Sequence, residues 1–201
     1  MYGVVVDVAN VLMIACVGVA AYLLYKSEQH EISSLRRPSE VDDLTALPNR
    51  SFFRRAATRR ISLSRENYIP LVCLVLDIDA FKPYNDDFGH EAGDNALRCL
   101  GCILRSSVRA DNIAARYGGE EFVLLVNGFP EEAAVVAERI RSRVERECSP
   151  ERDASMLRQM TSSLGVVPLT KETQTLDKLI EAADRQMYRA KRSGKNRVSV
   201  A

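Results

Sequence analysis

The stretch RYGGEEF, residues 116–122, decides how the rest of the chain is interpreted. Apolar runs flank it, NIAA before and VLLV after, which is typical of two strands joined by a tight hairpin turn. Glycines suit such a turn, so we place it at Gly118 and Gly119. A hairpin has no need of two adjacent carboxylates, and Glu120 and Glu121 therefore indicate a function at its tip.

Two chemical features meet at this tip. The glycines leave backbone N–H groups accessible and allow close approach, which suits a phosphate group. The carboxylates of Glu120 and Glu121 suit a hard cation such as Mg²⁺. Because a triphosphate carries roughly four negative charges, bare carboxylates would repel it at contact distance. The two features agree if a metal lies between them, and that combination is typical of phosphoryl transfer.

A second pair of acids, Asp77 and Asp79, lies at the end of the apolar run PLVCLVLDIDAF, residues 70–81. The continuous run predicts a buried strand, and alternation along it points both acids to the same side. Strand ends beside a loop are common ligand sites. A calcium-binding loop is excluded because Phe81 takes the next ligand position and no glycine follows where one is required. A solvated strand end explains one acid more easily than a spaced pair.

The remaining pattern alternates helices with strands, which predicts an α/β or α+β domain with one central sheet. Apolar residues at helical spacing indicate the helices, and short apolar runs bounded by turn residues indicate the strands. We predict helices at residues 51–67, 91–108, 131–147 and 176–194, a hairpin at 112–126, and further strands at 159–169 and 196–200.

Composition limits the classes of function. The chain has 201 residues, 46% hydrophobic and 27% charged, which allows one ordinary domain with a real core and an appendage. A formal net charge of +1 argues against a bulk nucleic-acid binder, and we expect no nucleic-acid partner. Recognition of an anionic ligand must therefore be local.

The five cysteines are an odd number, and most lie in apolar surroundings. We predict reduced core residues rather than a disulfide framework. Cys99 and Cys102 form a C-x-x-C motif, but no second Cys/His pair lies at zinc spacing. Their setting in ALRCLGCIL favours buried packing on a helix.

The first 25 residues differ in kind from the rest, because residues 8–25 carry no charge. As a helix this segment would span about 27 Å, close to the bilayer core, so we predict a transmembrane helix in residues 1–25. Arg36 and Arg37 follow it and place the C-terminal part in the cytoplasm. The alternative is a helix that packs in a core or a dimer without a membrane. Residues 26–41 read as a helical neck, and the domain occupies residues 42–201.

Five blocks of the sequence, taken in order, resemble the diguanylate cyclase (GGDEF domain) family, here with a GGEEF signature. They are DDLTALPNR, DIDAFKPYNDDFGHEAGD, RYGGEEF, TSSLG and MYRAKRSGKNRV, and they cover nearly all of residues 42–200. The resemblance implies a central, mostly antiparallel sheet surrounded by helices, akin to nucleotidyl cyclases and polymerase palms. It also implies condensation of two GTP into cyclic di-GMP with release of pyrophosphate, using two Mg²⁺ or Mn²⁺ ions per active site.

The resemblance assigns roles to particular residues. Asp77, Ile78, Glu120 and Glu121 match the metal-binding positions, and Glu120 would also help to deprotonate the attacking 3′-hydroxyl. The catalytic set is completed by Lys82, which with Phe81 matches a loop over the phosphates. The substrate-binding positions implied are Phe81, Asn85, Asp94, Gly118, Gly119, Lys191 and Lys195.

Within that set, Asn85 and Asp94 match a pair that hydrogen-bonds guanine, whose N1–H and N2–H₂ donors adenine cannot supply. Gly118 and Gly119 would let GTP lie across the turn, and the lysines would lie at its triphosphate. Lys195 stands where arginine is frequent in the family, which replaces a bidentate fork by a point charge.

The family's inhibitory site reads R-x-x-D just upstream of the signature, and this chain departs from it. Arg109 is present, but the final position holds Asn112 and an acid, Asp111, comes one place early. Since an asparagine cannot supply the carboxylate for a bidentate guanine contact, we predict weakened or absent product inhibition.

The resemblance implies a homodimer, because each site would hold one GTP and attack the GTP of a second subunit. From the uncharged N-terminal segment and the arginines that follow it, we expect a single-pass protein of the bacterial inner membrane, with the catalytic domain in the cytoplasm. Two alternatives stay open. One is a catalytically degenerate domain that binds GTP, cyclic di-GMP or a partner, and the other is an unrelated nucleotidyl cyclase or polymerase-like enzyme.

Overall fold

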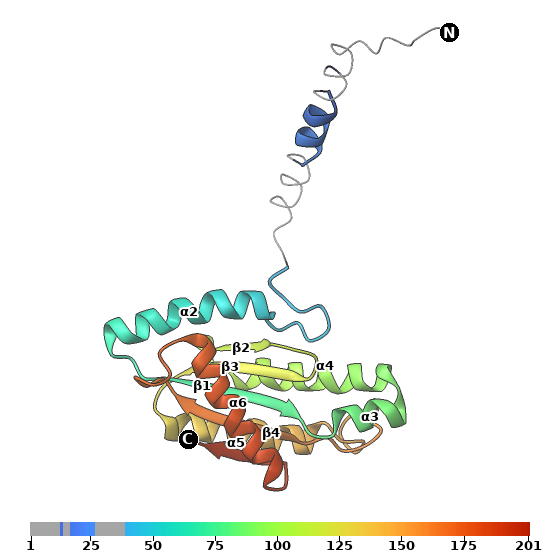
Figure 1. Ribbon diagram of the computed structural model, residues 1–201. Coiled ribbons are helices and arrows are strands. Elements are labelled where there is room, and N and C mark those ends of the chain that lie inside the picture. The colour runs from blue at the N-terminus through green and yellow to red at the C-terminus, as the bar shows by residue number, and fades with distance from the viewer. Residues whose placement is uncertain (1–12, 14–16, 27–38) are drawn as a thin grey trace. The chain divides into compact units, whose positions relative to one another are not determined.

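The computed structural model describes residues 13, 17–26 and 39–201 (Figure 1). The chain divides into two compact units, Met1–Ser39 and Glu40–Ala201. The second unit contains every strand named below and all the residues predicted to form the site.

A five-stranded sheet in the order β2-β3-β1-β4-β5 forms the centre of the second unit. Neighbouring strands run antiparallel except β4 and β5, which are parallel. The predicted mostly antiparallel central sheet is therefore confirmed. The strands are β1 (Leu71–Ile78), β2 (Ile113–Arg116), β3 (Glu121–Asn127), β4 (Ser162–Pro168) and β5 (Val198–Val200).

Helices cover both faces of the sheet (Figure 1). Strand β1 shows why, because all eight of its residues are buried and successive side chains point to opposite faces. Leu74 packs in the apolar cluster that includes α4 and α5, and Cys73 packs in the cluster that includes α2 and α6. These four helices are α2 (Arg50–Asn67), α4 (His90–Ser107), α5 (Pro130–Glu147) and α6 (Leu176–Arg192).

The structure differs from the prediction directly after β1. The strand ends at Ile78, Ala80 adopts a left-handed conformation with φ of 56°, and helix α3 (Phe81–Phe88) begins. Phe81 and Tyr84 lie three residues apart and are both buried, so they form one apolar face of that helix. The segment at Phe81, expected to be a loop, is thus the first turn of a helix. The continuous apolar run gave no sign that the strand ends before it.

The predicted membrane helix is wrong. Among the described residues no helix is long and apolar enough to cross a bilayer, and this overturns the predicted single-pass location in the inner membrane. Residues 1–12 and 14–16 of the predicted span, and residues 27–38 of the predicted neck, lie outside the described residues.

The cysteine prediction is also wrong in part. Cys99 and Cys148 form a disulfide with their Cα atoms 6.1 Å apart, and Cys102 is exposed. Helices α4 and α5 lie together on one face of the sheet, which brings Cys99 to the residue that follows α5. A separation of 49 residues along the chain gives no sign of this pairing. Cys73 is free and buried as predicted, and burial raises the pKa of its thiol to about 12.

Candidate active site

The sheet brings the end of β1 beside the hairpin tip. Asp77 is the register partner of Glu121 across the antiparallel pair β1–β3. Asp77 is only 5% exposed, whereas Glu121 is exposed and Glu120 precedes it on the tip. Two acidic segments more than forty residues apart in the sequence therefore lie at one edge of the sheet. We call Asp77, Glu120, Glu121 and the neighbouring Lys191 the tip site.

Lys191 lies in the last turn of α6, and its Nζ is 2.6 Å from Asp77 Oδ1. Burial raises the pKa of Asp77 to about 6; the ammonium of Lys191 opposes this shift, and the charges of Glu120 and Glu121 add to it. Burial likewise raises the pKa of Glu120, with Lys191 opposing and Glu121 contributing. One ammonium among three carboxylates leaves the tip site short of positive charge.

The glycines at the tip serve space rather than backbone conformation, which corrects the expectation that the turn requires them. Neither Gly118 nor Gly119 adopts a left-handed φ. A Cβ added at Gly118 would lie 2.7 Å from Glu121 Oε2. A Cβ added at Gly119 would have no described heavy atom within 4 Å, so this position faces open space.

Arg116 holds the tip in place. Its guanidinium donates to the carbonyl oxygen of Gly119 at 2.8 Å and forms an ion pair with Asp42 at 3.1 Å. Asp42 also accepts from the backbone and hydroxyl of Thr45. Burial raises the pKa of Asp42, but the hydrogen bonds from Thr45 and Arg116 prevail and lower it. The segments DDLTALPNR and RYGGEEF are therefore linked by the ion pair between Asp42 and Arg116, which the sequence analysis did not predict.

Asn85 on α3 and Asp94 on α4 are both half-buried. The Oδ1 atom of Asn85 is buried and accepts no hydrogen bond from the described residues. Gly93 makes room for it, because a Cβ there would lie 1.8 Å from that oxygen. An unpaired buried acceptor is costly unless a ligand or water completes it. The sequence analysis did not predict that Gly93 leaves space for Asn85, although Gly93 directly precedes Asp94 in the sequence.

Of the other predicted site residues, two are buried and two are exposed. Phe81 packs in the core at 7% exposed and does not lie over the surface. Lys82 is exposed on the first turn of α3, and Lys195 is exposed on the turn that follows α6. Ile78 is buried and pairs with Ser162 of β4.

A metal ion requires several donors at once. Within residues 13, 17–26 and 39–201, no group of three or more His, Cys, Asp or Glu side chains is arranged to hold one. In this arrangement the ammonium of Lys191 is the cation that Asp77 contacts.

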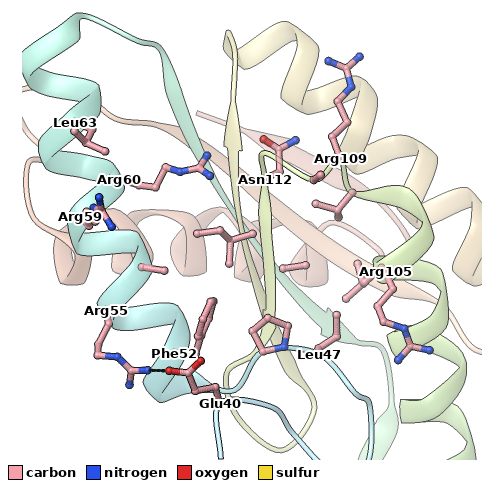
Figure 2. A pocket seen from close by; sticks show the side chains of 17 residues that line it. Glu40, Leu47, Phe52, Arg55, Arg59, Arg60, Leu63, Arg105, Arg109 and Asn112 are labelled. Atoms are coloured by element: carbon pink, nitrogen blue, oxygen red, sulfur yellow. Dashed lines mark hydrogen bonds and ion pairs between the residues drawn. The ribbon is translucent and has the colours of Figure 1, made fainter.

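A hollow of about 980 Å³ lies away from the tip site, between α2, the end of α4 and β2 (Figure 2). Arg109 and Asn112 both line it, and Figure 2 shows them on its upper wall. The Oδ1 atom of Asn112 accepts from the backbone N–H of Asn127 at 2.9 Å, so this side chain already has a partner. The side chain of Asn127 in turn donates to Asp111. The charged residues that line the hollow are Glu40, Arg55, Arg59, Arg60, Arg105 and Arg109.

Comparison with known proteins agrees with this architecture. The chain is 40% identical over 142 residues to diguanylate cyclase A of Treponema denticola, which covers 70% of this chain. It is 34% identical over 175 residues to the probable diguanylate cyclase DgcT of Escherichia coli, which covers 85% of this chain. The chain spans 38% of the length of each of these two curated relatives.

A solved structure gives the same result for the fold. The GGDEF domain of DgcB from Caulobacter crescentus, in complex with c-di-GMP, matches with a TM-score of 0.76 and 32% identity. The match covers 82% of this chain and 97% of that one. Residues 39–197 match the family described as "Diguanylate cyclase, GGDEF domain", and the chain therefore belongs to the GGDEF domain family of diguanylate cyclases.

Proposed function

We propose that this domain condenses two molecules of GTP into cyclic di-GMP and releases pyrophosphate. The observation that carries the proposal is the tip site, where Asp77 lies in register with Glu121 and contacts Lys191. Relatives named as diguanylate cyclases, matched over 70% and 85% of this chain, support the same activity.

The donors at the tip site fit a divalent cation in their chemistry. They are carboxylate oxygens, which Mg²⁺ and Mn²⁺ prefer. Burial raises the pKa of Asp77 and of Glu120, and neighbouring carboxylates add to both shifts, so a bound cation would be favoured there. Asp77, Glu120 and Glu121, with the backbone carbonyl of Ile78, would hold the two ions. When bound, the metal would supply charge stabilisation for the attacking and leaving oxygens.

The side chains around this site then divide the work on the nucleotide. Glu120 would take the proton from the attacking 3′-hydroxyl. Lys191 would transfer its ammonium from Asp77 to the triphosphate, and the exposed Lys82 and Lys195 would add positive charge along it. The open space at Gly119 would let the phosphates pass close to the backbone.

Guanine would be recognised at α3 and α4. The Oδ1 atom of Asn85 is an acceptor without a donor among the described residues, and Asp94 on the neighbouring helix supplies a carboxylate. The N1–H and N2–H₂ groups of guanine provide those donors, and adenine lacks them. Leaving these acceptors unpaired is what would reject ATP.

Two domains are needed for one product, because the cyclic product contains two new phosphodiester bonds and each site holds one GTP. A homodimer with facing sites would supply each 3′-hydroxyl to the α-phosphate held by the partner. Product formed per chain should therefore rise with protein concentration until dimers dominate. The test measures turnover per chain over a roughly thousandfold dilution, which spans the dissociation constants of weak and tight dimers. Equal turnover per chain across this dilution would exclude the dimeric arrangement.

The direct test incubates the purified chain with GTP and Mg²⁺ and measures cyclic di-GMP by chromatography. The wild-type protein should form product, and Glu120→Ala should form none. Glu172→Ala is the matched control, because Glu172 is an exposed glutamate that bonds only within its own loop, to Thr170. A wild-type chain that binds GTP but forms no product at high concentration would instead be a binding module.

We also propose that product inhibition is weak. In the family pattern the guanine-binding acid of the inhibitory site stands where this chain has Asn112, whose oxygen bonds the backbone of Asn127. Arg109 lines the hollow, but the acid that accompanies it in the family pattern is replaced by Asn112 (Figure 2).

A further inference from the structure

Asp79 is the acid of the D-x-D pair that the proposed function leaves without a role. Its side chain is buried, at 6% exposed. It accepts three hydrogen bonds, from Ser163 Oγ at 2.7 Å, from Thr161 Oγ1 at 2.8 Å and from the backbone N–H of Asn196 at 2.9 Å. Both carboxylate oxygens therefore accept from donors in β4, in the residue just before it and in the turn after α6, and these donors lie outside the tip site.

The turn that Asp79 contacts has an unfavourable backbone. Lys195 and Asn196 have φ values of 60° and 45°, so two successive non-glycine residues lie in the left-handed region. Such residues persist only where the surroundings hold them. The N–H of Lys195 donates to the carbonyl of Ala190, and that of Asn196 donates to Asp79 Oδ2.

The side chain of Asn196 holds the turn from the other side. Its amide nitrogen donates to Glu145 at 2.8 Å, and its oxygen accepts from Arg141 at 2.7 Å. Both partners belong to α5. The turn at Lys195 is thus fixed between the end of β1, through Asp79, and helix α5, through Asn196.

We infer that Asp79 is a positioning residue that fixes the left-handed turn at Lys195 and Asn196 and so presents Lys195 to the triphosphate. The inference rests on the proposed function for the identity of the ligand. It explains the spaced pair of acids, because Asp77 serves the ligand directly and Asp79 serves it through the backbone of Asn196.

The amide of asparagine separates this role from a metal-binding role. In Asp79→Asn the amide oxygen still accepts from Asn196 N–H and Thr161, and the amide nitrogen donates to the Ser163 hydroxyl, which rotates to accept. A positioning role therefore survives Asp79→Asn and fails in Asp79→Ala. A metal ligand would fail in both.

The experiment compares two probes by calorimetry in Mg²⁺. One is 3′-deoxy-GTP, which carries the triphosphate but has no 3′-hydroxyl to react, and the other is GMP. Asp79→Ala should weaken 3′-deoxy-GTP about tenfold or more, as for one lost charge-assisted contact, and leave GMP within about twofold. Asp79→Asn should bind both probes as the wild type does.

Two further variants test the turn itself and cover the case in which Asp79→Ala does not fold. Asn196→Val places a β-branched residue at a left-handed φ and should reproduce the selective loss of 3′-deoxy-GTP. Asn196→Gly is the matched control, because it loses the same side-chain bonds to α5 while glycine favours that φ, and it should weaken 3′-deoxy-GTP less than Asn196→Val does. Combining Asn196→Val with Lys195→Ala should weaken binding no more than Lys195→Ala alone, since coupled residues are not additive.

Equal weakening of both probes in Asp79→Ala and Asn196→Val would overturn the inference, because a merely structural role has no preference for the triphosphate. Additive losses in the double variant would also overturn it. So would a wild-type chain that binds 3′-deoxy-GTP no more tightly than GMP. Failure to form cyclic di-GMP from GTP would count against the proposed function alone, because these binding measurements need no turnover.

Discussion

Asp77 and Asp79 lie two residues apart at the end of one strand, and their surroundings are opposite. Asp77 is buried beside Glu120 and Glu121, and its pKa is raised to about 6 although Lys191 opposes the shift. Asp79 is equally buried but receives three hydrogen bonds from protein donors. The charge of Asp77 is disfavoured chiefly by burial, which one ion pair opposes, whereas Asp79 has hydrogen-bond donors on both carboxylate oxygens.

Two asparagines repeat the contrast. The Oδ1 atom of Asn85 is buried and unpaired among the described residues, whereas the Oδ1 atom of Asn112 accepts from Asn127. A polar group left unsatisfied in the folded state is destabilising on its own and is retained where a ligand completes it. We propose that the contrast separates residues that bind a ligand from residues that hold the fold, and variants on each side can test it.

The largest effect is expected for Asp77→Asn. Loss of a carboxylate that we propose holds the metal should reduce cyclic di-GMP formation by roughly a hundredfold or more. Asp79→Asn should retain most of the activity, because its hydrogen bonds survive. The measurement is initial rate at saturating GTP and Mg²⁺ for the two isosteric variants side by side. Equal loss in both would break the distinction between the two acids.

Asp77→Asn should lower activity but raise the free energy of unfolding at neutral to basic pH. The pKa of Asp77 is raised from its ordinary value of 3.8 to about 6, so the folded state keeps a proton that the unfolded chain has lost between these values. Stability of the metal-free protein therefore falls as pH rises from about 4 to about 6 and is level above that. Asp77→Asn lacks this fall and should be more stable at pH 8 by at most about 3 kcal/mol.

Urea unfolding at pH 4, 6 and 8 in a chelating buffer measures this difference. The curves of the wild type and Asp77→Asn should converge at the lowest pH. Asp153→Asn is a suitable control, because bonds from Ser155 lower the pKa of that exposed carboxyl, and its loss gives no gain at pH 8. A wild type that is more stable than Asp77→Asn at pH 8 would show that the ion pair with Lys191 outweighs the burial of the charge.

A smaller effect is expected at Asn85 on α3, which we propose contacts guanine. Asn85→Ala should raise the KM for GTP about tenfold and reduce discrimination against ATP, because one acceptor for the base is lost. Its melting temperature should be unchanged or higher, since the oxygen removed has no partner in the described structure. Asn67→Ala on α2 is a control asparagine, because its amide bonds only the preceding turn of its own helix. A KM unaffected by Asn85→Ala would remove this residue from the site.

Much of this contrast depends on contacts that the sequence does not display. The buried strand β1, the hairpin and the four long helices follow from local periodicity, and the pairing of Asp77 with the tip follows from the two acidic segments. The partners of Asp79 lie 82, 84 and 117 residues away, and one of them is a backbone N–H that has no residue signature. The disulfide and the space at Gly119 likewise depend on packing between elements.

The smallest expected effect concerns the hollow beside α2. Asn112→Asp should increase the affinity for cyclic di-GMP several-fold, by roughly the 1 kcal/mol of one improved hydrogen bond, because a carboxylate matches the guanine edge that an amide cannot. The bond from Asn127 N–H is retained, since aspartate also accepts it, so the fold should be unaffected. The gain is limited because that same bond already engages one oxygen of the side chain. Calorimetry of the wild type, Asn112→Asp and Arg109→Ala provides the comparison, and tight wild-type binding that Arg109→Ala abolishes would show that a satisfied asparagine still serves a ligand.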